Sequence, residues 1–209
     1  MKSGTRPRRL FSASSLSLVV PRPIHYIADM LIRTPIRALG HVDCRSLAAL
    51  ATAAPEAAWF DDVRRQTDYD VHAETQSIIL RFCTGWPAVS VANGPGWEPF
   101  AAAAMPIMQA IIGQHYPEGG VILRAMLARL RPGCRIPRHQ DAHPSFAICH
   151  RIHVPLSTND EVEFVVGRYR VPPRQNDAFE LNNAMPHQVA NNGTTTRIHF
   201  IFDYAPRTG

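Results

Sequence analysis

Apolar and polar residues alternate in short runs along the second half of the chain. Six runs of strand length, separated by turn residues, cover 121–131, 148–156, 162–167, 177–182, 187–190 and 196–204. Several short strands joined by turns are typical of a β-sandwich or a β-barrel. The pattern therefore predicts a mainly β fold for this half of the chain.

The first half carries the signals of two helices that flank these strands. Residues 46–54 are rich in alanine and stop before Pro55, and residues 98–115 combine alanine, methionine and isoleucine. Pro99 stands at the start of the second segment, where helices accept proline, and Pro106 is expected to kink it. Strand-like runs cover 75–82 and 88–92, and a mixed pattern covers 24–50.

Length and composition indicate one globular domain. The chain has 209 residues, of which 45% are hydrophobic and 19% charged, which is enough for a sizeable core. Residues 1–23 are rich in Arg, Ser and Pro and contain no acidic residue, so we expect a flexible N-terminal arm rather than a targeting peptide. Residues 24–209 are expected to form the domain. No apolar run reaches the roughly 18 residues of a transmembrane helix, so no membrane partner is expected.

Charge and cysteine content bear on the expected partners and the cellular compartment. The net charge is +5, from 21 Arg and a single Lys against 17 acidic residues, and no basic run exceeds two residues. Basic residues spread in this way predict no nucleic-acid surface, although they attract anionic ligands. The four cysteines have no CxxC spacing and predict free thiols in a reducing compartment, hence a cytoplasmic protein.

Histidines gather where metal chemistry would need them. Six of the ten histidines fall between residues 139 and 199, among them His139, two residues before Asp141, and His187 in a polar segment after a predicted strand. Two histidines and one carboxylate hold non-haem Fe(II) and leave open coordination positions. A single His-x-Asp match also fits an ordinary polar turn after Pro132-Gly133, so the motif needs support from other residues.

Basic residues in two predicted strands supply that support. Arg197 lies in an apolar run, and arginine is rarely buried without a partner. That partner is either a bound carboxylate or a structural Asp or Glu. Arg151 and His153 share one face of a second strand, with apolar residues on the other face, which suits either a wet pocket or a solvent-facing strand.

Residues 120–204 resemble the aspartyl/asparaginyl β-hydroxylase family, a branch of the 2-oxoglutarate/Fe(II) dioxygenases that includes bacterial proline hydroxylases. The similar phrases are Leu130-Arg-Pro-Gly-Cys-Arg-Ile136, His139-Gln-Asp141, Arg151-Ile-His-Val-Pro-Leu-Ser-Thr-Asn159, Val162-Glu-Phe-Val-Val-Gly167, Asn182-Asn183, His187-Gln-Val-Ala-Asn191 and Arg197-Ile-His-Phe-Ile-Phe-Asp-Tyr204. The resemblance implies a double-stranded β-helix, a cupin-like jelly-roll barrel with its catalytic core at 120–204.

The resemblance also implies the site and its cofactors. His139, Asp141 and His187 would be the Fe(II) ligands, and Arg197 would anchor the co-substrate 2-oxoglutarate. Arg151 and His153 would lie near the carboxylates of co-substrate and substrate. O2 would be the oxidant, and ascorbate is expected to stimulate turnover.

Two departures from the animal peptidyl hydroxylases of this family bear on the substrate. Those enzymes have glycine where this chain has Asp141, and a pocket serine where it has Ala128. Asp141 also argues against halogenation, since related halogenases lack the carboxylate. If Ala128 faces the pocket, Arg124 shares its face; Arg124 then either binds a substrate carboxylate or forms a salt bridge at the barrel rim.

These observations predict an Fe(II)/2-oxoglutarate-dependent dioxygenase that hydroxylates an unactivated C–H of an amino acid, free or within a peptide. The alternatives are a non-enzymatic cupin-like module that binds metal or ligand, an iron enzyme that does not use 2-oxoglutarate, and an oxygenase acting on another natural product. Arg197 disfavours the first two alternatives, because neither needs a buried arginine ten residues beyond the last ligand.

Overall fold

The computed structural model describes residues 16–19, 32–62, 73–172 and 174–207. Its strands are β1 (Leu16–Val19), β2 (Ile36–His41), β3 (Thr75–Thr84), β4 (Ala88–Asn93), β5 (Val121–Leu130), β6 (Arg135–His139), β7 (His150–Ser157), β8 (Val162–Val166), β9 (Tyr169–Val171), β10 (Asp177–Leu181), β11 (His187–Asn191) and β12 (Arg197–Ala205). The helices are α2 (Arg45–Ala53) and α4 (Trp97–His115), with 3-10 turns η2 (Glu56–Phe60) and η4 (Pro144–Ile148).

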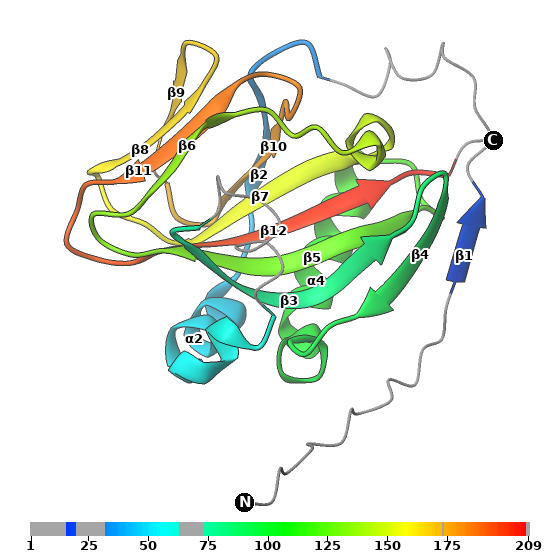
Figure 1. The fold of residues 1–209 in the computed structure, drawn as a ribbon, viewed down its shortest axis with the longest axis horizontal. Helices are drawn as coiled ribbons and strands as arrows, with labels where there is room; N and C mark the ends of the chain where they lie inside the picture. Colours follow the sequence, from blue (N-terminus) through cyan, green and yellow to red (C-terminus); the bar gives the residue numbers. More distant parts are fainter. Residues whose placement is uncertain (1–15, 20–31, 63–72, 173, 208–209) are drawn as a thin grey trace, which may run out of the picture.

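The strands form two antiparallel sheets (Figure 1). The larger has eight strands in the order β1-β4-β3-β5-β12-β7-β10-β2, and the smaller has four in the order β6-β11-β8-β9. An apolar cluster joins the facing sides of the sheets, with Leu130 and Phe179 from the larger sheet and Phe164 and Val189 from the smaller. This arrangement confirms the predicted jelly roll, although the two sheets are not closed into a barrel.

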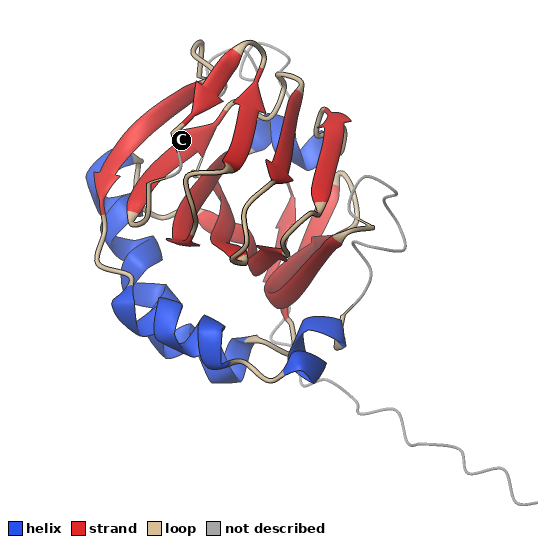
Figure 2. Cartoon of the chain, turned by 90° about the vertical axis from the view of Figure 1, so that its left-hand side faces the viewer, coloured by secondary structure: helices blue, strands red, loops and turns tan. Residues whose placement is uncertain are grey.

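The helices cover the other side of the larger sheet (Figure 2). Leu47 of α2 and Met108 of α4 pack with Leu127 and Phe200 of the sheet, and all four are almost fully buried. The central strands of the larger sheet, such as β12, are thus buried on both sides. None of the helices in the described part of the chain has the length and apolar character needed to cross a bilayer.

Burial on both sides explains the composition of the central strand β12. Ile198, Phe200 and Phe202 pack towards the helices, so the intervening positions point between the sheets, because successive strand residues face opposite ways. Those positions include Arg197 and Asp203, both buried. The space between the sheets therefore combines apolar side chains with charged ones.

Most predicted elements are confirmed, and the exceptions are edge strands. Both helices and the strands over 75–82, 88–92 and the second half appear within a few residues of their expected bounds, with Pro106 inside α4. The sequence pattern did not predict β1, β2, β6 or β9. The expected arm, 1–23, lies mostly outside the described residues, and its described part is β1, which pairs with β4. All four cysteines are free, as predicted.

Candidate metal centre

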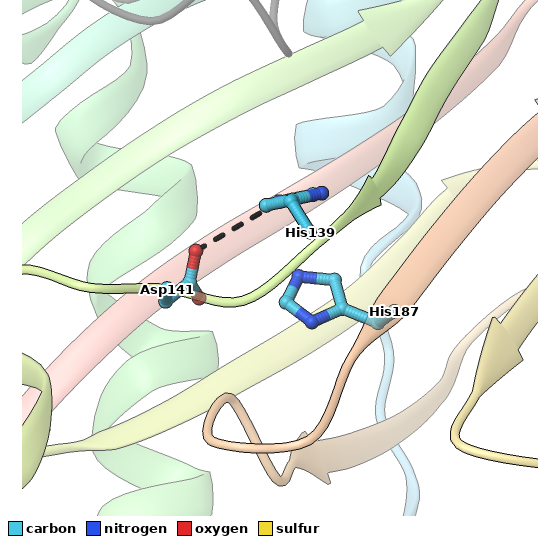
Figure 3. A group of neighbouring side chains, drawn as sticks. All are labelled: His139, Asp141 and His187. Atoms are coloured by element: carbon cyan, nitrogen blue, oxygen red, sulfur yellow. Dashed lines mark ion pairs between the residues drawn. The ribbon is translucent and has the colours of Figure 1, made fainter.

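Strand pairing brings the three predicted metal ligands together. His139 is the last residue of β6 and His187 the first residue of β11, and the two stand directly opposite each other in the smaller sheet. Their ring centroids are 4.3 Å apart. Asp141 follows two residues after His139, and its Oδ1 lies 3.9 Å from Nε2 of His139. Figure 3 shows the three side chains pointing towards one another, and their ligand atoms all lie within 4.8 Å.

Both histidines are held in the orientation that a metal requires. Nδ1 of His139 lies 2.8 Å from the carbonyl oxygen of Pro137, and Nδ1 of His187 lies 3.0 Å from that of Met185. A carbonyl only accepts, so each Nδ1 carries the proton and each Nε2 keeps its lone pair. Burial lowers the pKa of His187, which favours the neutral imidazole that binds metal. The donor set therefore fits Fe(II).

The loop that carries Asp141 is anchored to the loop before His187. The backbone N–H of Asp141 donates to the carbonyl of Asn183 at 3.2 Å, and the side chain of Gln140 donates to the carbonyl of Ala184 at 2.6 Å. These bonds hold the segment beyond the end of β6 against the segment that leads into β11. The position of Asp141 relative to His187 is therefore fixed by hydrogen bonds between the two loops.

A chain of buried ion pairs runs from Asp141 into the larger sheet. Nη1 of Arg151 donates to Oδ2 of Asp141 at 2.8 Å, while its Nε and Nη2 donate to the two oxygens of Asp203 at 2.8 and 2.9 Å. Arg124 donates to the same Asp203 at 3.2 Å and to Ser145 at 2.7 Å. Burial raises the pKa of Asp203, but the two arginines outweigh burial and the net pKa is lowered. Asp203 is therefore a buried carboxylate anion.

A second basic group lies further inside. Nη2 of Arg197 lies 2.9 Å from Nδ1 of His199, and Nδ1 of His199 lies 3.4 Å from Nδ1 of His153. His153 stacks on Phe179 at 5.2 Å, and the guanidinium of Arg197 lies 5.7 Å from the ring of Phe164. Burial, followed by the charges of Arg197 and His153, holds the pKa of His199 well below its usual value. His199 is thus neutral and accepts from Arg197.

The register of the smaller sheet relates Arg197 to the metal ligands. His187 is paired with Val166, and Val189 is paired with Phe164, the ring beside Arg197. Two residues along a strand span about 7 Å. Arg197 therefore lies beside Phe164, the strand partner of the next inward-facing residue after the predicted ligand His187.

A family comparison decides the class of the protein. The sequence model described as "Aspartyl/Asparaginyl beta-hydroxylase" matches residues 49–206. The chain belongs to this family. It is accordingly a 2-oxoglutarate-dependent non-haem Fe(II) dioxygenase, as the resemblance implied. No curated protein matches the chain.

Solved structures show where else this hydroxylase fold occurs. A viral collagen prolyl hydroxylase from Paramecium Bursaria Chlorella virus-1, in complex with 2-oxoglutarate, is 11% identical with a TM-score of 0.51, covering 84% of this chain and 98% of its own. The non-heme monooxygenase ThoJ, as a nickel complex, is 14% identical with a TM-score of 0.50, covering 82% and 74%. At this identity the likeness concerns the fold.

The hydroxylase structure brings most of the predicted site residues into contact, but it adds two that sequence reasoning missed. His139, Asp141 and His187 meet, Arg151 and Arg124 join them through Asp203, and Arg197 and His153 meet through His199. Asp203 and His199 were not predicted. Both alternate with Arg197 along one strand, so the period of two that placed Arg151 beside His153 could also have identified them.

Proposed function

We propose that this protein hydroxylates an unactivated C–H of an amino acid, free or peptide-borne, with Fe(II), O2 and 2-oxoglutarate. The observation that carries the proposal is the preoriented set of His139, Asp141 and His187, with the buried Arg197 beside Phe164 in the same space between the sheets. Bound Fe(II) would supply O2 activation coupled to the decarboxylation of 2-oxoglutarate to succinate and CO2. Ascorbate would stimulate turnover by keeping the iron reduced.

The chain contributes position and charge to this chemistry. Nε2 of His139, Nε2 of His187 and Oδ1 of Asp141 would hold the metal on one side and leave the opposite side open. Arg197 would hold the distal carboxylate of 2-oxoglutarate. A charge-assisted pair at this buried position is worth more than at the surface, because Phe164 and Phe179 exclude water.

The substrate assignment rests on Arg151 and Arg124, with His153 nearer the co-substrate. Every nitrogen of Arg151 already donates within the protein, and both Nη atoms of Arg124 have a partner. A guanidinium has five N–H groups, so donors remain for the carboxylate of an amino-acid substrate. Phe146 lies against both guanidinium groups, at 4.7 Å from Arg124 and 4.3 Å from Arg151, and would give such a substrate an apolar contact.

A panel of small molecules tests the proposal. Free amino acids, their amides and the corresponding amines are incubated with the enzyme, Fe(II), 2-oxoglutarate and ascorbate in air. We expect amino acids with a free carboxylate, or peptides, to gain one oxygen atom by mass spectrometry with equimolar succinate. Equal turnover of amines or neutral terpenoid-like molecules would overturn the amino-acid assignment and favour an oxygenase of another natural product.

A further inference from the structure

Asp203 occupies the centre of a row of charged residues that spans three neighbouring strands. In the larger sheet it pairs directly with Arg124 of β5 on one side and with Arg151 of β7 on the other. Its Oδ1 accepts from Arg151, and its Oδ2 accepts from both arginines. Asp203 is fully buried (0% exposed), so no water competes for these bonds.

The contact between Asp203 and Arg151 also fixes the orientation of the guanidinium group. Two parallel hydrogen bonds, from Nε at 2.8 Å and from Nη2 at 2.9 Å, set the plane of the guanidinium group. The remaining nitrogen, Nη1, is thereby directed at Oδ2 of Asp141, also at 2.8 Å. With Oδ2 held in this way, Oδ1 is the oxygen of Asp141 that faces His139.

From this geometry we infer that Asp203 is a positioning residue for the metal centre. It holds Arg151, and Arg151 holds Asp141 so that one chosen carboxylate oxygen is presented to the metal. Partners that hydrogen-bond a ligating carboxylate orient it, and their loss commonly weakens metal binding by 10- to 100-fold. The inference rests on the metal site of the proposed function.

The competing explanation is that Asp203 only neutralises two buried arginines. Removal of one partner from a buried ion pair destabilises a protein whatever its function, so stability does not separate the two explanations. Metal affinity does, provided that it is compared with the loss of a similar carboxylate elsewhere. Glu180 supplies the control: it is 2% exposed and binds Arg37, Tyr116 and His150.

The experiment is an anaerobic titration of metal-free protein with Fe(II) against a competing chelator, without 2-oxoglutarate or substrate. We expect Asp203→Asn to raise the Kd for Fe(II) by about 10- to 100-fold. Glu180→Gln should lower the Tm of the metal-free protein, as Asp203→Asn does, and leave the Kd at the wild-type value. A folded Asp203→Asn protein with wild-type Kd overturns the inference, and so does an equal loss of affinity in Glu180→Gln.

Two further variants keep the test decisive if Asp203→Asn does not fold. The double variant Asp203→Asn/Arg124→Met removes one charge of each sign. It still lacks the Asp203 carboxylate that accepts two hydrogen bonds from Arg151. Arg151→Lys keeps every charge but cannot bind both carboxylates through a planar fork. We expect either folded variant to lose Fe(II) affinity, and wild-type affinity overturns the inference. If these losses occur but the wild-type enzyme does not decarboxylate 2-oxoglutarate, the proposed function fails and the positioning role stands.

Discussion

At the scale of single residues, the metal centre depends on hydrogen bonds that the sequence does not encode as a motif. His139 and His187 each have Nδ1 against the carbonyl two residues earlier, so Nε2 is the nitrogen that faces the metal site. The family resemblance implied His139, Asp141 and His187 as ligands, and their role stays a prediction. The tautomers of the two histidines, and the hydrogen bond from Arg151 to Asp141, follow from contacts that form only in the folded chain.

Arg197 gives the first residue-scale prediction. A charge-assisted hydrogen bond contributes about 1.5–3 kcal/mol, and 1.36 kcal/mol corresponds to a factor of ten. Arg197→Ala should therefore raise the KM for 2-oxoglutarate by about 10- to 150-fold, as measured by succinate formation. An unchanged KM in a protein that melts cooperatively would place the anchor elsewhere.

His199 gives a prediction about pH. Its pKa in the folded protein lies well below the usual 6.5, so the unfolded chain binds its proton first as the pH falls. The free energy of unfolding should then decrease below about pH 6.5, by up to about 1.4 kcal/mol per pH unit from this residue, until the folded-state pKa is reached.

Urea unfolding of the metal-free protein between pH 5 and 8 measures this slope. His199→Asn should reduce the decrease between pH 6.5 and 5, since one buried neutral histidine is lost. The same slope in wild type and variant would show that His199 does not contribute.

At the scale of elements, one face of β12 packs against the helices and stabilises the fold, while the other face holds the charged residues of the candidate site. Phe200 is fully buried among the residues between the larger sheet and the helices. Phe200→Ala should lower the free energy of unfolding by about 3–5 kcal/mol and leave the KM for 2-oxoglutarate unchanged in the folded fraction. Denaturant unfolding measures the change in stability, and succinate kinetics on the same preparation measure the KM. A raised KM would contradict the division of the strand into two faces.

Elements also show how far the sequence could predict the fold. The strands that it missed, β1, β2, β6 and β9, are the four edges of the two sheets. An edge strand buries few side chains, so its hydrophobic pattern is weak; in β6 only Ile136 is buried. Pro137 weakens the signal further and is tolerated at an edge. The sequence thus predicted His139 as a ligand without predicting the strand that holds it.

At the scale of the whole molecule, the jelly roll gathers residues from five strands. The smaller sheet places His139 opposite His187. The larger sheet sets Arg124, Asp203 and Arg151 side by side on β5, β12 and β7. The family resemblance predicted this fold. The buried charge network could not be predicted, because it depends on the register of three strands.

The measurement that tests the central claim most directly is succinate formation from 2-oxoglutarate in air, with and without added Fe(II). We expect the wild-type protein to form succinate only with Fe(II). His139→Ala and His187→Ala should each form essentially none, because each variant loses one of the three predicted ligands and the remaining two do not hold the metal. His115→Ala, at the end of α4, is the matched control and should retain activity. Near-wild-type succinate formation by folded His187→Ala would contradict the account.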